Sequence, residues 1–216
     1  GVNFGTNQTT GDKLGKTFDG SRQSIVFTDT LGGGMTFNQA DATRTVLNLR
    51  PADGKSIPLT NAAGQDLNRA WQAPSAERSP EVLFVQQQMA RIGVDGFLDI
   101  HGDEEIPHVF TAGCEGNPGF SPRLDALEQE FRQRLMAVGE FQVEHGYPRD
   151  EPGQANLALA CNWVGQTYDC LAFTVEMPFK DHDDNPQPRT GWNGARSQKL
   201  GQDVLSVLAQ MVATLR

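Results

Sequence analysis

Helical and strand patterns alternate through the second half of the chain, and this alternation most constrains the fold. Two short runs, residues 94–102 (VDGFLDIHG) and 171–179 (LAFTVEMPF), are apolar along most of their length and are typical of buried strands. Amphipathic helical patterns occur near residues 80–92, 122–135 and 194–214. This order predicts an α/β domain in which helices cover both faces of a sheet.

Local signals mark where these helices begin and end. Ser79 and Ser121 are good N-caps, and the proline that follows each one stands at the first helical position, where its missing N–H costs nothing. Gly93 is expected to end the first helix. The apolar face of that helix is predicted to contain Val82, Leu83, Val85, Met89 and Ile92. The stripe of the last helix is predicted to contain Leu200, Val204, Leu208 and Val212.

The N-terminal part of the chain has a different composition. Residues 1–41 are rich in Gly, Thr, Asn and Asp and predict loops with a hairpin or two, including a strand-like run, SIVFTD, from residue 24. Residues 43–50 alternate as a strand does, and residues 51–58 (PADGKSIP) read as a turn. We therefore divide the chain into an irregular segment, 1–41, that is part of or appended to the main domain, 42–216.

Composition narrows the class of partner. The formal net charge of −9 argues against a nucleic-acid partner, because proteins that bind phosphate backbones usually carry a basic face. No apolar run approaches the length of a membrane span, so no membrane partner is expected. Three scattered cysteines do not form a disulfide framework and are expected to be reduced, buried thiols of a cytoplasmic protein. These data do not indicate an oligomeric state.

Several polar residues stand where a purely structural side chain would be unfavourable. His101 ends one predicted strand, in the position where α/β sheets bind ligands, and Glu176 interrupts the other strand among apolar neighbours. Asn68 and Arg69 lie together in a polar segment ahead of Pro74. Each has a structural alternative: a histidine bonded to a loop, a salt-bridged glutamate, or a surface arginine. Their joint occurrence favours a functional site.

Four segments carry a resemblance to a known family. They are NAAGQDLNRAW from residue 61, SPEVLFVQQQM from 79, GVDGFLDIHGDEEIPHVF from 93 and FTVEMPFKD from 173. From about residue 44 to the C-terminus, the chain resembles the zinc carboxypeptidases, specifically the branch of the cytosolic carboxypeptidases and their bacterial relatives. The resemblance implies a mixed, largely parallel central sheet with helices on both faces, and makes residues 42–216 a carboxypeptidase-like catalytic domain.

The resemblance also implies a chemistry for each residue. The cofactor would be zinc, with His101 as a metal ligand and Glu176 as the general base for the metal-bound water. Asn68 and Arg69 would bind the terminal carboxylate of the partner, a peptide or protein C-terminus, because a guanidinium donates two parallel hydrogen bonds to a carboxylate. The expected activity is hydrolytic removal of C-terminal residues.

The sequence departs from the family pattern in its first ligand motif. Residues 1–67 contain no histidine, so the His-x-x-Glu pair that precedes the Asn-Arg pair in the family is not found. His108, His145 and His182 are expected to be loop or surface histidines, and Tyr168 is the tyrosine nearest Glu176 in sequence. Two function hypotheses follow: a zinc-dependent metallocarboxypeptidase that is truncated or degenerate, and a catalytically inactive module of the same fold that binds peptide C-termini.

Overall fold

The computed structural model divides the chain into two units, Gly1–Leu59 and Thr60–Arg216. The residues that it describes are 24–28, 34–41, 44–50 and 60–215. The turn predicted at residues 51–58, and the loops predicted before residue 24, lie outside the described residues.

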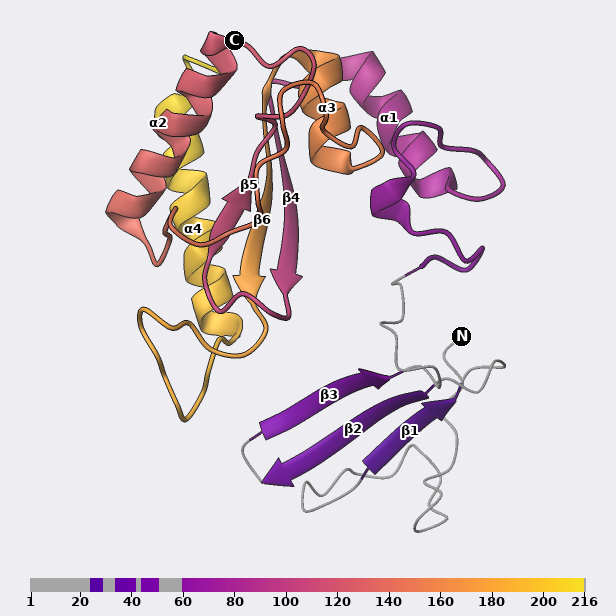
Figure 1. The fold of residues 1–216 in the computed structure, drawn as a ribbon, viewed down its shortest axis with the longest axis vertical. Helices are drawn as coiled ribbons and strands as arrows, with labels where there is room; N and C mark the ends of the chain where they lie inside the picture. Colours follow the sequence, from indigo (N-terminus) through magenta and orange to yellow (C-terminus); the bar gives the residue numbers. More distant parts are fainter. Residues whose placement is uncertain (1–23, 29–33, 42–43, 51–59, 216) are drawn as a thin grey trace. The chain divides into compact units, whose positions relative to one another are not determined.

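The first unit contains a three-stranded antiparallel sheet (Figure 1). Its strands β1 (Ser24–Thr28), β2 (Gly34–Asp41) and β3 (Arg44–Arg50) pair in the order of the sequence, with an irregularity between Gln39 and Asp41. The strand-like runs predicted from residues 24 and 43 are both present. The boundary predicted after residue 41 falls within this unit, at the connection between β2 and β3.

The sheet of the second unit is mixed. It has the order β4-β6-β5, with β4 at Gly96–Asp103, β6 at Leu171–Pro178 and β5 at Phe110–Ala112. β4 and β6 are parallel, whereas β5 and β6 are antiparallel. The α/β class is therefore as predicted, but the described residues of this unit contain one pair of each kind rather than a predominance of parallel pairing.

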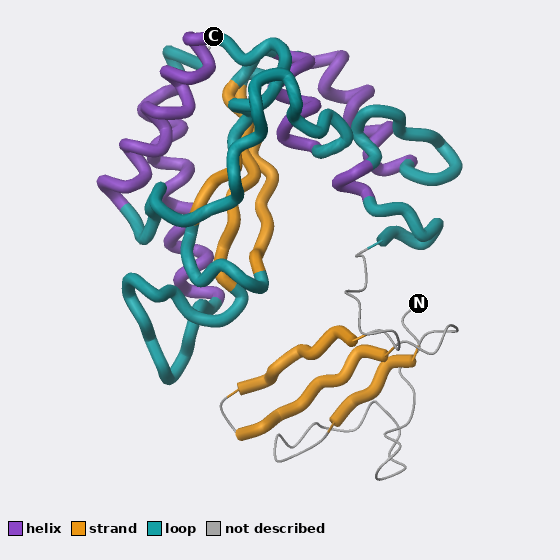
Figure 2. The backbone as a smooth tube through the Cα atoms, in the orientation of Figure 1, coloured by secondary structure: helices purple, strands orange, loops and turns teal. Residues whose placement is uncertain are grey.

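Helices lie on both sides of this sheet (Figures 1 and 2). On one side, α2 (Pro122–Val138) and α4 (Gly194–Met211) lie next to each other. On the other side are α1 (Pro80–Ile92) and α3 (Ala160–Tyr168). The helix α3 was not predicted from the sequence, and no described helix is long and apolar enough to cross a membrane.

The predicted helix starts are present with one difference in capping. The hydroxyl oxygen of Ser121 accepts the N–H of Leu124, as an N-cap should. The hydroxyl of Ser79 instead accepts the N–H of Ser75 and so holds the preceding turn. The predicted apolar face of α1 is only partly buried, because Val82 lies in the core while Ile92 is largely exposed.

The alternation of side chains along β6 builds two cores and one open surface. Leu171, Phe173 and Val175 point toward α2 and α4, where each buried side chain contributes about 1.5–3 kcal/mol. Ala172 points to the opposite face and packs near α3. Gly165 allows α3 to approach closely, because a Cβ at this position would lie only 2.6 Å from the sulfur of Cys114. Further along that second face, polar side chains replace apolar ones and form the candidate site.

Candidate active site

Strand pairing brings the two predicted site residues together. His101 of β4 is the register partner of Glu176 of β6, and because the strands are parallel both side chains leave the same face near the carboxyl ends. Nδ1 of His101 lies 3.8 Å from Oε1 of Glu176, and its Nε2 lies 3.1 Å from Oδ2 of Asp99. The hydrogen bond that His101 donates to Asp99 is the largest cause that raises the pKa of His101 above its ordinary value.

Glu176 is a buried carboxylate with one free oxygen. Its residue is 3% exposed, and burial raises its pKa above the ordinary value, while His101 and Tyr147 oppose that shift. Its Oε2 has no hydrogen-bond partner among the described residues. A buried carboxylate oxygen without a partner is unfavourable unless the site binds another group there, so this atom is available to a water molecule or substrate.

Tyr147 completes the site and was missed in the sequence. Its hydroxyl lies 2.6 Å from Oδ2 of Asp103 and 3.2 Å from Oε1 of Glu176. A phenol has one proton to donate, and the shorter contact goes to Asp103. Burial raises the pKa of Tyr147, followed by its hydrogen bond to Asp103, so the hydroxyl stays protonated. Tyr168, the tyrosine nearest Glu176 in sequence, instead packs its ring against Trp163.

Asp103 orients Tyr147 from a fixed position. Its Oδ1 accepts the backbone N–H groups of Glu105 at 2.8 Å and Ile106 at 2.5 Å, so the turn after β4 holds the carboxylate. Burial works against ionisation of Asp103, but these hydrogen bonds and the one from Tyr147 outweigh it and lower its pKa. Among the acidic residues that follow His101, Asp103 is buried and holds Tyr147 in place, whereas Glu104 is exposed.

Asn68 and Arg69 lie on the short 3-10 helix η1 (Leu67–Arg69). The side-chain oxygen of Asn68 accepts the N–H of Ala160 at 3.0 Å, which joins η1 to the first turn of α3. The guanidinium of Arg69 is 63% exposed and donates to Asp66 at 2.7 Å. Its charge lies near enough to His101 to lower the pKa of that imidazole, against the larger effect of Asp99.

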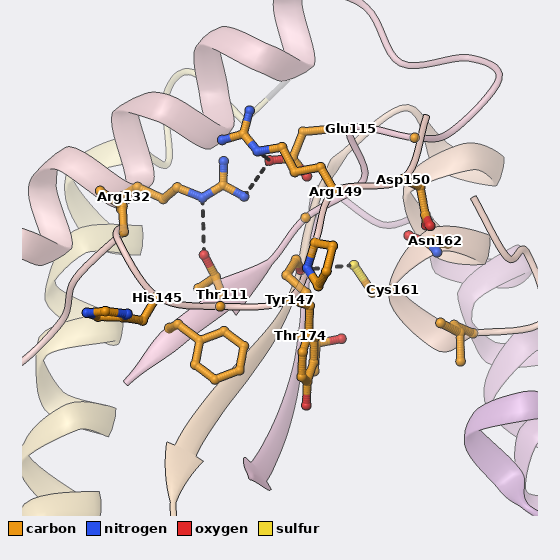
Figure 3. A pocket seen from close by; sticks show the side chains of 18 of the residues that line it. Thr111, Glu115, Arg132, His145, Tyr147, Arg149, Asp150, Cys161, Asn162 and Thr174 are labelled. Atoms are coloured by element: carbon orange, nitrogen blue, oxygen red, sulfur yellow. Dashed lines mark hydrogen bonds and ion pairs between the residues drawn. The ribbon is translucent and has the colours of Figure 1, made fainter. Parts of the chain in front are cut away.

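A polar cavity of about 360 Å³ lies beside Tyr147 (Figure 3). Thr174, two positions before Glu176 on β6, lines it together with Cys161 and Asn162 of α3. Arg132 also lines it, and the ion pairs of this guanidinium hold Glu115 at 2.8 Å and the buried Glu128 at 3.1 Å. These contacts give the positive charge of Arg132 two acidic partners.

The described residues do not complete a zinc site at His101. Catalytic zinc takes three protein ligands and leaves one position open, and both ring nitrogens of His101 face carboxylates. Among the described residues, the histidines and carboxylates with convergent donor atoms are His108, His182 and Asp184. His108, His145 and His182 all lie on loops, within the expectation of loop or surface positions. His108 and His182 are buried there, whereas His145 is exposed.

Comparison with solved structures shows what most of this chain is related to. A metallo-carboxypeptidase from Pseudomonas aeruginosa, solved with (2-guanidinoethylmercapto)succinic acid, is 76% identical with a TM-score of 0.72, over 78% of this chain and 43% of that one. This chain is related to the metallo-carboxypeptidases. A metallo-carboxypeptidase from Burkholderia cenocepacia is 44% identical with a TM-score of 0.69, over 77% of this chain and 42% of that one. The family resemblance seen in the sequence is thus confirmed.

The chain is also similar to a protein of unknown function and to a domain family. An uncharacterized protein of Zymomonas mobilis is 52% identical over 157 residues, which are 72% of this chain and 41% of that protein. A domain family of unknown function, DUF7926, matches residues 1–99. This carboxypeptidase-related chain spans less than half the length of each of these relatives.

Proposed function

We propose that this protein acts as a zinc-dependent carboxypeptidase that hydrolyses the C-terminal peptide bond of peptides or proteins. The observation that carries the proposal is the buried Glu176, with one unpartnered oxygen, held between His101 and Tyr147 beside a polar cavity. The identity of 76% to a metallo-carboxypeptidase supports it. A buried carboxylate between a histidine and a tyrosine is suited to activating a water molecule next to a bound peptide C-terminus.

In this proposal Glu176 is the general base. Its Oε2 takes a proton from the attacking water as the water oxygen bonds to the scissile carbonyl carbon, and the proton then passes to the leaving nitrogen as the C–N bond breaks. The raised pKa brings the carboxyl nearer to neutral pH, where a base both accepts and returns a proton readily. Tyr147, which stays protonated, supplies a hydrogen-bond donor beside this carboxylate.

Zinc would contribute Lewis acidity and a more acidic bound water. His101 would be one ligand, and the described residues place no second ligand set around it. The steps of the proposed mechanism are those of Glu176, Tyr147 and the binding residues.

Asn68 and Arg69 would bind the substrate carboxylate. The amide nitrogen of Asn68 is a donor whose position is set by the bond from its oxygen to α3. Arg69 would exchange its exposed pair with Asp66 for two parallel bonds to the chain end. The P. aeruginosa relative was solved with a dicarboxylic acid, which supports carboxylate recognition in this group. The adjacent cavity would receive the side chain of the terminal residue.

The test uses paired peptides with a free or an amidated C-terminus. With zinc added, mass spectrometry should detect release of the terminal residue from the free acid only. Glu176→Gln should lower the rate by about 10²–10⁴-fold, since it removes the base. Glu104→Gln, which changes an exposed carboxylate on the following turn, should leave the rate unchanged. Binding of the acid without any release would instead favour the inactive, C-terminus-binding module.

The carboxylate clamp has its own measurement. Arg69→Ala should weaken binding of the free-acid peptide about ten- to a hundredfold, because a hydrogen bond to a charged group contributes roughly 1.5–3 kcal/mol. Arg69→Lys should also weaken it, because an ammonium cannot form the bidentate pair. Equal affinity of the acid and amide peptides for the unmodified protein would contradict the clamp.

A further inference from the structure

Three of the four histidines of the chain gather in a cluster that does not include His101. His108 precedes β5, and His182 and Asp184 follow β6, so the two strand ends bring them together. The ring of His145 stacks on that of His108, with centroids 4.2 Å apart and planes within 12°. The mechanism proposed above uses none of these residues.

The donor atoms converge on one small volume. Nδ1 of His108 lies 3.1 Å from Oδ2 of Asp184, and Nδ1 of His182 lies 3.9 Å from the same oxygen. The three donor atoms all lie within 4.8 Å of one another. Two ligands in a tetrahedral zinc site are about 3.3 Å apart, given metal–ligand distances near 2.0–2.1 Å. Because the side chain of Asp184 is 57% exposed, it is free to make the small adjustment required.

The hydrogen bonds of His182 indicate which of its ring nitrogens carries the proton. Its Nε2 lies 3.2 Å from the carbonyl oxygen of Glu140, while its Nδ1 accepts the N–H of Asp184 at 3.2 Å. A proton on Nε2 satisfies both contacts, whereas the other tautomer satisfies only the N–H of Val109, 3.3 Å from Nε2. In the favoured tautomer the Nδ1 lone pair accepts the backbone N–H of Asp184, and a metal ion would replace this N–H as its partner. A bond from the opposite ring nitrogen to a carbonyl is the usual support of a metal-binding histidine.

The surrounding charges also favour a cation. The segment that carries His182 and Asp184 contains two further acidic residues, Asp181 and Asp183, and Glu140 lies beside it. Arg196 neutralises part of this charge, through contacts of 3.0 Å to Asp181 and 2.8 Å to Glu140. The carboxylate of Asp184 instead faces two imidazoles, which are buried neutral ligands when deprotonated.

We propose that His108, His182 and Asp184 bind a divalent transition-metal ion such as zinc at a site separate from His101. Two imidazoles and a carboxylate are a ligand set that zinc accepts, with a remaining position for water. The ion would join the start of β5 to the loop after β6. It would also fix His108, against which His145 stacks, and His145 lies on the pocket-lining segment that leads to Tyr147. The site therefore stabilises the cavity wall.

The experiment titrates the purified full chain with Co²⁺, read by its visible absorption, and with Zn²⁺ by calorimetry. We expect stoichiometric binding that Asp184→Asn weakens at least about tenfold, since even supporting partners of metal ligands contribute 10–100-fold. Asp183→Asn is the matched control, because it removes the neighbouring exposed carboxylate and should leave affinity unchanged. His101→Ala should also leave it unchanged, which separates this site from the one in the proposed function.

A second readout covers variants that fold poorly. Zinc should raise the thermal unfolding midpoint of the unmodified protein and of Asp183→Asn, because an ion that binds only the folded state stabilises it. At the same zinc concentration it should raise the midpoint of Asp184→Asn and of His108→Gln by less. The proposal is overturned by the absence of stoichiometric binding, by equal affinity in Asp184→Asn, or by loss of binding in His101→Ala, which would assign the ion to the other site.

Discussion

Tyr147→Phe removes one hydroxyl and leaves the aromatic ring in place. The ring keeps its edge-to-face contact with Phe110, whose ring centroid is 4.9 Å away. What is lost is the 2.6 Å hydrogen bond to Asp103 and the 3.2 Å contact to Glu176. The substitution therefore measures what the hydroxyl contributes to the site, with little change in packing.

The expected cost follows from the charge and exposure of the partners. A hydrogen bond to an ionised group contributes about 1.5–3 kcal/mol when it is buried. Tyr147 is 47% exposed, so water replaces part of the lost bond, and Asp103 keeps its two backbone donors. We expect unfolding free energy to fall by about 1–2 kcal/mol at neutral pH. Without the phenol, the pKa values of both Asp103 and Glu176 should rise, because the hydroxyl lowers each of them.

The dependence on pH has a defined sign. The folded pKa of Asp103 is lower than its ordinary value of 3.8, so its contribution is fully present above that value and is lost as the pH falls through the folded value. The part of the destabilisation by Tyr147→Phe that comes from Asp103 should therefore be constant from neutral pH down to about pH 5 and shrink only at more acid pH.

Urea denaturation of four proteins tests this account: the unmodified chain, Tyr147→Phe, Asp103→Asn and the double variant. A coupling energy near 1 kcal/mol between the two positions is expected, as for residues in direct contact. Tyr168→Phe, which removes the other tyrosine hydroxyl of the chain, should change stability by less than about 0.5 kcal/mol. If the two tyrosine variants cost the same, or the cycle gives no coupling, the reasoning about Asp103 is refuted.

Three further outcomes are expected from other parts of the structure. Phe131→Ala should lower unfolding free energy by about 3–5 kcal/mol in denaturant titrations, because this ring is fully buried, whereas Phe84→Ala, at 60% exposure, should cost less than about 0.5 kcal/mol. Burial, and next the charge of Glu115, raise the pKa of Glu128 to about 8. The folded protein therefore holds this proton more tightly than the unfolded chain, and the unfolding free energy should decline as the pH rises from about 4.5 to about 8. Glu128→Gln should flatten that decline. Asp99→Asn should lower the pKa of His101 in an NMR titration, since the Asp99 hydrogen bond is the largest cause of its elevation; an unchanged pKa would contradict this.

Local sequence signals determined the elements on which the site is built. The prolines after Ser79 and Ser121 began two helices where expected, because proline is favoured at the first helical position. The apolar runs gave β4 and β6, and the polar interruption at Glu176 indicated a functional position. Helix α3 was missed because it is short, carries Gly165 and buries residues on much of its surface, so it lacks a clear apolar stripe.

The convergence of these elements was decided by tertiary structure. Whether His101 lies opposite Glu176 depends on the register of two strands far apart in the chain, which local periodicity does not encode. The same holds for Tyr147, which reaches Glu176 from a loop although Tyr168 is nearer in sequence, and for His108, which meets His182 only because β5 and β6 are paired. Residue types are fixed by sequence, but distances between side chains follow from long-range packing, and chemistry depends on those distances.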